Sequence, residues 1–226
     1  MFEQQPDNLR QKIEKLAQEA QDKSDPSSWF ESLYQDATGD SSQFPWAKLD
    51  IHPFFQDWLK ENPISGAGKT ALVIGCGLGD DAETLTKLGF EVMAFDISPT
   101  AIAWCKRRFP ESKVNYQVAD LFTLPSKWKN TFDFVFECRT IQALPLSVRS
   151  RCIEAIAEMV TPHGTLLVIT RLRDSEISDP KGPPWPLSEV ELSQLQNMGF
   201  SEVRRRQYLE PEEEPILQAC LAYTMG

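Results

Sequence analysis

From Lys69 onward, the sequence alternates short apolar runs with segments of helical periodicity. The apolar runs, several of them rich in β-branched residues, are expected to form strands at 70–74, 92–95, 114–118, 132–136 and 165–170. Segments of helical pattern separate them at 80–88, 99–108 and 146–160. Apolar strands joined by helices predict a parallel sheet that is buried on both faces and connected by right-handed crossovers.

The C-terminal part of the sequence adds a helix and two strands to this pattern. The helix is expected at 187–198 and the strands at 202–208 and 216–223, joined by an acidic turn that contains Glu212 and Glu213. Two strands this close together predict an antiparallel pair at the edge of the sheet. The predicted fold class is therefore α/β, with a doubly wound, mostly parallel, seven-stranded sheet and an antiparallel edge strand.

The first 68 residues have a different character. An amphipathic helical pattern at 8–21 is followed by a shorter one at 29–36, and a third starts after Pro53 and ends near Glu61. This region is short for an independent domain. We expect residues 1–68 to form a helical cover on the domain made by residues 69–226.

A glycine-rich turn, Gly75-Cys76-Gly77-Leu78-Gly79, joins the first expected strand to the helix that follows it. Glycines at this point allow a sharp turn and let a ligand approach bare backbone. Asp96 ends the next strand about twenty residues later, where a carboxylate can accept hydrogen bonds from both hydroxyls of a bound ribose. The turn and the aspartate together predict a site for a nucleoside-containing cofactor.

The two residues after the turn, Asp80 and Asp81, distinguish between two classes of cofactor. A dinucleotide site needs glycine or alanine at the position of Asp80, so that the helix packs tightly beneath a pyrophosphate. Two carboxylates at a helix N-terminus also repel a pyrophosphate. S-adenosylmethionine has no phosphate and carries a sulfonium and an ammonium group, so the charges favour this cofactor over NAD(P).

Several segments resemble known sequence motifs. VIGCGLGDDAETL and VMAFDISPTAI resemble the first two motifs of class I S-adenosylmethionine-dependent methyltransferases, and VADLFTLP, FDFVFECRTIQALP and TPHGTLLVI are similar to the later ones. DISPTAI, the ALP after the fourth strand, and GPPWPLSEVEL more narrowly resemble the thiopurine, thiol and halide methyltransferase family. The resemblance implies a Rossmann-like methyltransferase fold, S-adenosyl-L-methionine as cofactor, and in-line transfer of its methyl group to a small molecule.

The resemblance also assigns residues. Asp120 would bind the adenine amino group and Leu121 would flank the adenine ring. The complete set of expected cofactor-binding residues is Gly75, Cys76, Gly77, Gly79, Asp96, Ile97, Ala119, Asp120, Leu121, Glu137, Cys138 and Trp46. Four residues are expected to bind the methyl acceptor. They are the N-terminal aromatic residues Trp29 and Phe44, Arg139 after the fourth strand, and Trp185 in a proline-rich loop at 181–186. The N-terminal aromatic residues, including those of Phe44-Pro45-Trp46, could equally pack the cover onto the sheet.

Glu137, at the end of the fourth expected strand, has three open roles: it could contact the cofactor, accept a proton from the substrate, or cap the next helix. A thiolate, selenolate or halide needs no base in the transfer step. An alcohol or amine can need one, and Glu137 or Asp40 is then the candidate. Cys138 is expected to be a small buried side chain rather than a nucleophile, because no histidine lies near it in sequence.

Charge and cysteine content limit the partners and the compartment. A net charge of −10 disfavours nucleic acid, whose phosphates need an excess of Lys and Arg, and anionic membranes. No apolar run reaches the roughly 18 residues of a membrane helix, and the polar N-terminus is not a signal peptide. Five scattered cysteines without C-x-x-C spacing favour the cytoplasm and, with only two histidines, no metal site.

The predicted function is methylation of a small molecule, with sulfur or another soft nucleophile as the acceptor atom, by a monomer or homodimer. Two alternatives stay open at this point. One is an O- or N-methyltransferase of a small metabolite, and the other is a non-catalytic S-adenosylmethionine-binding partner protein.

Overall fold

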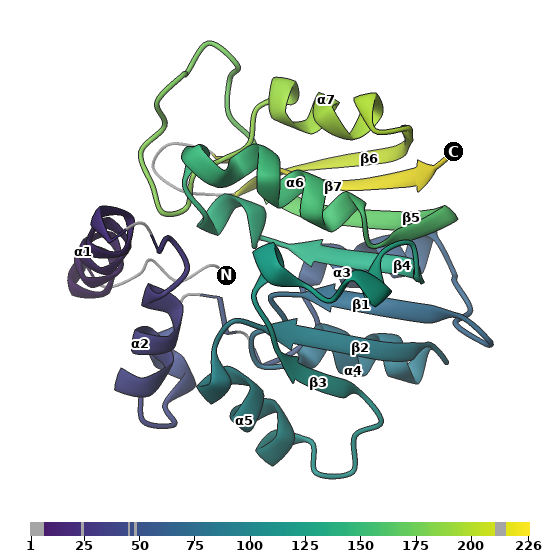
Figure 1. The fold of residues 1–226 in the computed structure, drawn as a ribbon, viewed down its shortest axis with the longest axis horizontal. Coiled ribbons are helices and arrows are strands. Elements are labelled where there is room, and N and C mark those ends of the chain that lie inside the picture. The colour runs from purple at the N-terminus through teal and green to yellow at the C-terminus, as the bar shows by residue number, and fades with distance from the viewer. Residues whose placement is uncertain (1–6, 24, 45, 48, 211–215) are drawn as a thin grey trace.

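The structure is a computed structural model that describes residues 7–23, 25–44, 46–47, 49–210 and 216–226. Its centre is a seven-stranded sheet in the order β3-β2-β1-β4-β5-β7-β6 (Figure 1). The strands are β1 (Thr70–Ile74), β2 (Glu91–Asp96), β3 (Asn115–Val118), β4 (Phe132–Cys138), β5 (Val160–Arg171), β6 (Phe200–Glu210) and β7 (Ile216–Met225). The acidic turn over 211–215 lies outside the described residues.

The strand pairing confirms the predicted fold class. Strand β1 pairs in parallel with β2 and β4, β3 with β2, and β5 with β4. Strand β7 is antiparallel to both β5 and β6, so the expected antiparallel pair forms one edge of the sheet. The chain leaves β1 for β2 and β3 on one side and later returns to β4 on the other. Ligands of such sheets bind at this point, beyond the carboxyl ends of the strands.

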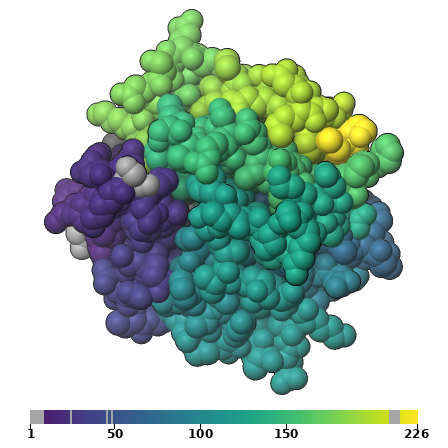
Figure 2. All heavy atoms as spheres, viewed as in Figure 1, coloured from purple at the N-terminus to yellow at the C-terminus, as the bar shows by residue number. Residues whose placement is uncertain are grey.

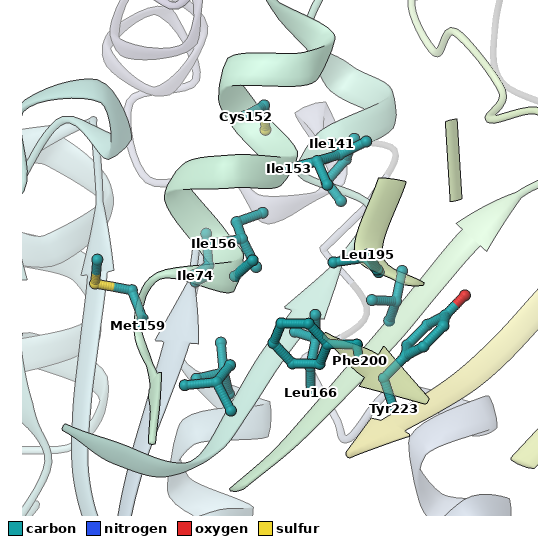
Figure 3. Close-up of a cluster of buried hydrophobic side chains, with 14 of the residues drawn as sticks. Ile74, Ile141, Cys152, Ile153, Ile156, Met159, Leu166, Leu195, Phe200 and Tyr223 are labelled. Carbon is teal, nitrogen blue, oxygen red and sulfur yellow. The ribbon is translucent and has the colours of Figure 1, made fainter. Parts of the chain in front are cut away.

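Helices cover both faces of the sheet, because successive strand residues point to opposite sides. One face packs on α3 (Pro53–Glu61), α4 (Asp80–Lys87) and α5 (Pro99–Arg108), with core residues such as Phe55, Leu85 and Ile102. The other face packs on α6 (Arg149–Ala157) and α7 (Glu189–Asn197). Figure 3 shows part of this second core, in which side chains of α6 and α7 meet those of the strands.

The N-terminal helices α1 (Asp7–Asp22) and α2 (Trp29–Asp36) lie together at one side of the molecule (Figures 1 and 2). Their apolar side chains form a third cluster with Trp104 of α5 and with Leu78 and Trp185. Helix α3 differs from α1 and α2 because it packs directly on the sheet: Phe55 stacks on Phe136 with ring centroids 4.5 Å apart. The term cover is used below for residues 7–47 alone. Among the described residues, no helix is long and apolar enough to cross a membrane.

One predicted helix, at 146–160, is divided in the structure. A 3-10 turn, η5 (Leu146–Val148), precedes α6, and β5 already begins at Val160. The Met159 carbonyl accepts hydrogen bonds from the backbone N–H groups of Thr131 and Phe132, so pairing with the start of β4 replaces the last helical turn. This pairing also makes β5 longer than the predicted strand.

Candidate functional site

A cavity of about 270 Å³ lies at the carboxyl ends of β1, β2 and β4, between the sheet and the cover. The whole glycine-rich turn lines it, together with residues that follow β2, β3 and β4 and with side chains of α1 and α2. The cavity therefore lies where the reversal of strand order predicts a ligand.

Two glycines of the glycine-rich turn are packed tightly against neighbouring side chains. Gly75 and Gly79 have positive φ angles of 57° and 91°. A Cβ atom on Gly75 would lie 2.5 Å from Thr140 Oγ1, and one on Gly79 would lie 2.5 Å from the Tyr116 hydroxyl. Both positions therefore need glycine, and the turn presents its backbone to the cavity.

Asp96 is buried where β2 ends, and it lines the cavity. Its two carboxylate oxygens accept hydrogen bonds from the N–H groups of Gly77 and Ser98, each at 3.0 Å. Burial raises the pKa of Asp96 to about 6, although these two bonds oppose the shift. The bonds fix the carboxylate beside the turn, where its remaining lone pairs fit the two hydroxyls of a ribose.

Beyond Asp96, the cavity wall continues along the residues after β3. Ala119, Asp120, Leu121 and Phe122 line it, and Ile97 follows Asp96. Asp120 accepts a hydrogen bond of 2.9 Å from the Phe122 N–H, which begins the 3-10 turn η2 (Leu121–Thr123). Apolar side chains with one carboxylate suit an adenine ring and its amino group, so this part of the wall fits a nucleoside.

The two aspartates that follow the turn have separate surroundings. Asp80 forms a bidentate pair with Arg108, with N–O distances of 2.7 and 2.8 Å. Asp81 accepts a hydrogen bond of 2.8 Å from the backbone N–H of His52. Burial raises the pKa of Asp81 to about 7.

The aromatic residues of the cover divide into two groups. Trp29 and Trp46 line the cavity, and Trp46 Nε1 donates a hydrogen bond of 3.0 Å to the hydroxyl of Tyr34, which also lines it. Phe44 and Trp185, both expected to bind the acceptor, are not among the lining residues and are buried in the third apolar cluster. Packing against Trp46 of the cover and Trp104 of α5 therefore accounts for Phe44, while Pro45 lies outside the described residues.

Glu137 occupies the capping role among its three open roles. It is fully buried, and its Oε1 accepts hydrogen bonds from the N–H groups of Thr140 and Ile141 at 2.6 and 2.9 Å. It is not among the cavity-lining residues, and neither is Asp40, whose exposed carboxylate accepts from the Ser42 N–H. The structure thus places both candidate bases outside the cavity wall.

Cys138 does line the cavity, and burial raises the pKa of its thiol well above the usual value. A raised pKa reduces the thiolate fraction, as expected for a side chain that fills space. No group of His, Cys, Asp or Glu residues that could hold a metal ion is found within the described ranges.

Three arginines also line the cavity. Arg139 follows β4, Arg171 ends β5, and Arg10 comes from α1. Arg139 has a left-handed backbone conformation with φ 65°, and its Nη2 donates to Gln218 Oε1 at 2.6 Å. Two residues of the proline-rich loop, Pro183 and Pro184, lie in the same wall.

Of these residues, the sequence singled out Arg139 but not Arg171, Arg10 or Tyr34. The position of Arg171 at the carboxyl end of a parallel strand could have identified it, because such strand ends face the ligand. Arg10 and Tyr34 lie on amphipathic helices, where the sequence pattern gives no sign of a cavity.

The chain is similar to known methyltransferases in sequence. The profile of the family described as Thiopurine S-methyltransferase (TPMT) matches residues 37–218. A thiopurine S-methyltransferase of Vibrio atlanticus (strain LGP32) is 24% identical over 183 residues, which make up 74% of this chain and 81% of that protein. A ubiquinone biosynthesis O-methyltransferase of Dechloromonas aromatica (strain RCB) is 31% identical over 127 residues, 55% of this chain and 53% of that protein. The chain thus spans about half the length of this second relative.

Solved structures share the fold. Magnesium protoporphyrin IX methyltransferase (ChlM) from Synechocystis PCC 6803, with bound SAM, has a TM-score of 0.67 at 18% identity, over 91% of this chain and 97% of that one. N-methyltransferase NodS from Bradyrhizobium japonicum WM9 has a TM-score of 0.65 at 20% identity, over 86% of this chain and 96% of that one.

Proposed function

The chain belongs to the thiopurine S-methyltransferase family, and from this premise we propose that it methylates the sulfur of a small thiol or a similar soft, anionic nucleophile. As a member of this family, it is an S-adenosylmethionine-dependent methyltransferase. The atom that receives the methyl group and the residues that bind each substrate belong to the proposal.

The division of charge in the cavity carries the proposal. Asp96 and Asp120 line the cavity where β2 and β3 end, and Asp81 lines it at the start of α4, which suits a cofactor with a sulfonium and an ammonium group. Arg139 and Arg171 line it where β4 and β5 end, on the other side of β1 in the strand order, and Arg10 lines it from α1, in a chain whose net charge is −10. Arginines beside an acceptor favour an anion over an ammonium group and lower the pKa of a bound thiol. A thiolate is an anion, and a thiol with a lowered pKa forms it more readily, so the arginines favour a thiolate as the acceptor.

The chain's own residues supply position and shielding. S-adenosylmethionine, when bound, provides a methyl group that is already activated for transfer. The glycine-rich turn and Asp96 would hold its adenosine part, and the acceptor would lie between the arginines and the aromatic wall of Trp29 and Trp46. Alignment of the nucleophile, the methyl carbon and the sulfur supplies much of the rate, and side chains of α1 and α2 form the wall of the cavity on the cover side.

The positions of the acidic residues also favour a thiolate. Glu137 and Asp40, the bases considered for an alcohol or amine, do not line the cavity. A thiolate needs neither of them. All five cysteines are free thiols, which supports a reducing compartment such as the cytoplasm as part of the proposal.

A second candidate is O-methylation of a small phenol, because similarity extends to the ubiquinone biosynthesis O-methyltransferases. Matched acceptors distinguish the two candidates. Thiophenol, phenol and aniline share a ring and differ in the nucleophilic atom. We expect formation of S-adenosylhomocysteine with thiophenol and at most weak turnover with the others. Turnover only with phenol or aniline would contradict the thiol proposal, and tight cofactor binding without any acceptor in cell extract would favour a non-catalytic binding protein.

The arginines can be tested with the same thiol. Arg171→Gln should raise the KM for thiophenol by about tenfold, the scale of one charge-assisted hydrogen bond. Arg107→Gln changes an exposed arginine of α5 that does not line the cavity, and it should leave the KM unchanged. Equal KM values for both variants and the wild-type protein would remove Arg171 from the acceptor site.

A further inference from the structure

Asp80 and Asp81 are adjacent, yet their carboxylates have different electrostatic partners. The guanidinium of Arg108 neutralises Asp80 through two hydrogen bonds. Asp81 accepts a hydrogen bond from the backbone N–H of His52. Both aspartates line the cavity, but Arg108 offsets the charge of Asp80, so Asp81 is the better placed of the two to bind a cation.

Among the described residues, two further carboxylates and a thiol act on or lie near the Asp81 carboxylate. On its own helix the neighbour is Asp80, and from the segment before α3 come the carboxylate of Asp50 and the side chain of His52. The Nδ1 atom of His52 accepts a hydrogen bond of 3.3 Å from the Phe54 N–H. From β4 the neighbour is the thiol of Cys138. A carboxylate that is buried beside other carboxylates is stabilised by a cation that enters the cavity.

The order of subsites along the sheet indicates which cation this is. Asp120 and Leu121, after β3, fit the adenine, and Asp96, at the end of β2, fits the ribose. The cofactor therefore runs from β3 towards β1 and β4, and its amino-acid part comes last. Asp81 lies at that end, beside Cys138 of β4.

We propose that the Asp81 carboxylate binds the ammonium group in the amino-acid part of S-adenosylmethionine, with the His52 backbone N–H holding the carboxylate in place. This proposal rests on the methyl donor of the proposed function and not on the acceptor. It gives the two ends of the cofactor separate acidic partners, Asp96 for the ribose and Asp81 for the amino group.

Three ligands separate the groups of the cofactor in calorimetric titrations. S-adenosylmethionine has both the sulfonium and the ammonium, S-adenosylhomocysteine keeps only the ammonium, and 5′-methylthioadenosine has neither. We expect Asp81→Asn to weaken binding of the first two equally, by about tenfold or more, and to leave the third within twofold of wild type. Asp96→Asn should weaken binding of all three, and Asp57→Asn, a change on the outer side of α3, should weaken none.

Any other pattern of affinities among the three ligands would contradict the proposal. Weaker binding of S-adenosylmethionine alone would assign Asp81 to the sulfonium, and equal weakening of all three ligands would assign it to the adenosine or to folding. Unchanged binding of all three would remove it from the cofactor site. If the wild-type protein binds none of the ligands, the proposed methyl donor fails instead, so the two failures are distinguishable.

Proton release provides a test without substitution. The pKa of Asp81 is raised to about 7 by burial, and a cation binds its ionised form, so binding of S-adenosylhomocysteine near pH 6.5 should release protons. Asp96, with a pKa of about 6, contributes to the release with every ligand that has a ribose. Near pH 6.5, binding of S-adenosylhomocysteine should therefore release more protons than binding of 5′-methylthioadenosine, and this difference should disappear by pH 8. Equal proton release by both ligands near pH 6.5 would overturn the proposal.

Discussion

The two walls of the cavity are held in different ways. On the sheet side, the glycine-rich turn and Asp96 sit at the ends of paired parallel strands, and backbone N–H groups fix the carboxylate. On the cover side, the contact between α2 and the sheet domain depends on Glu31, whose carboxylate accepts hydrogen bonds from the side chains of Ser98 and Thr100 and from the Thr100 N–H.

This difference separates recognition of the donor from closure of the site. Groups attached to strands keep their geometry as long as the sheet is folded. The cover is held by side-chain contacts and by an apolar cluster that it shares with Leu78, Trp104 and Trp185, without any strand pairing among its described residues, so we expect it to open at a lower free energy than global unfolding. We infer that the sheet wall determines which cofactor binds and that the cover mainly affects how tightly it is retained.

Replacement of Asp96 is expected to have the largest effect. Asp96→Ala removes a buried carboxylate from the sheet wall, and loss of charged hydrogen bonds should cost about 1.5–3 kcal/mol of S-adenosylmethionine binding, roughly a 10- to 150-fold loss of affinity. Glu91→Ala, at the exposed opposite end of the same strand, is the control. Unchanged affinity of the Asp96 variant in calorimetry would mean that the cofactor site is misplaced.

Release of the cover should have an intermediate effect. Glu31→Ala removes three hydrogen bonds between α2 and the start of α5, each contributing about 0.5–1.5 kcal/mol. We expect faster hydrogen exchange in α2, unchanged exchange in β1 and β2, and cofactor affinity lowered less than in the Asp96 variant. Equal acceleration in the strands would show that cover and sheet open as one unit.

A change within the cover should have the smallest effect. Trp46→Phe keeps a smaller aromatic ring in the cavity wall and removes the hydrogen bond to the Tyr34 hydroxyl. A loss of about 1 kcal/mol in the free energy of unfolding is expected, measured by urea denaturation, with cofactor affinity close to wild type. A loss of affinity as large as that of Asp96→Ala would place Trp46 among the main determinants of cofactor binding.

The sheet wall was largely predictable from the sequence, whereas for the cover the helices were predictable but the side chains that reach the cavity were not. Apolar runs of strand length and a glycine-rich turn are local signals, so the strands and the cavity position followed from them. The capping role of Glu137 could not be predicted, because it depends on burial and on two backbone N–H groups that approach the carboxylate only in the folded turn. Phe44 and Trp46 are two residues apart, and only tertiary packing determines which of them reaches the cavity.

The most direct measurement is a crystal structure of the protein with S-adenosylhomocysteine. We expect the ribose hydroxyls on Asp96, the amino group on Asp81, and the sulfur directed towards the wall that contains Arg139 and Arg171. A ribose bound away from Asp96, or a sulfur that faces a wall without these arginines, would contradict the division of the cavity into a donor part and an acceptor part.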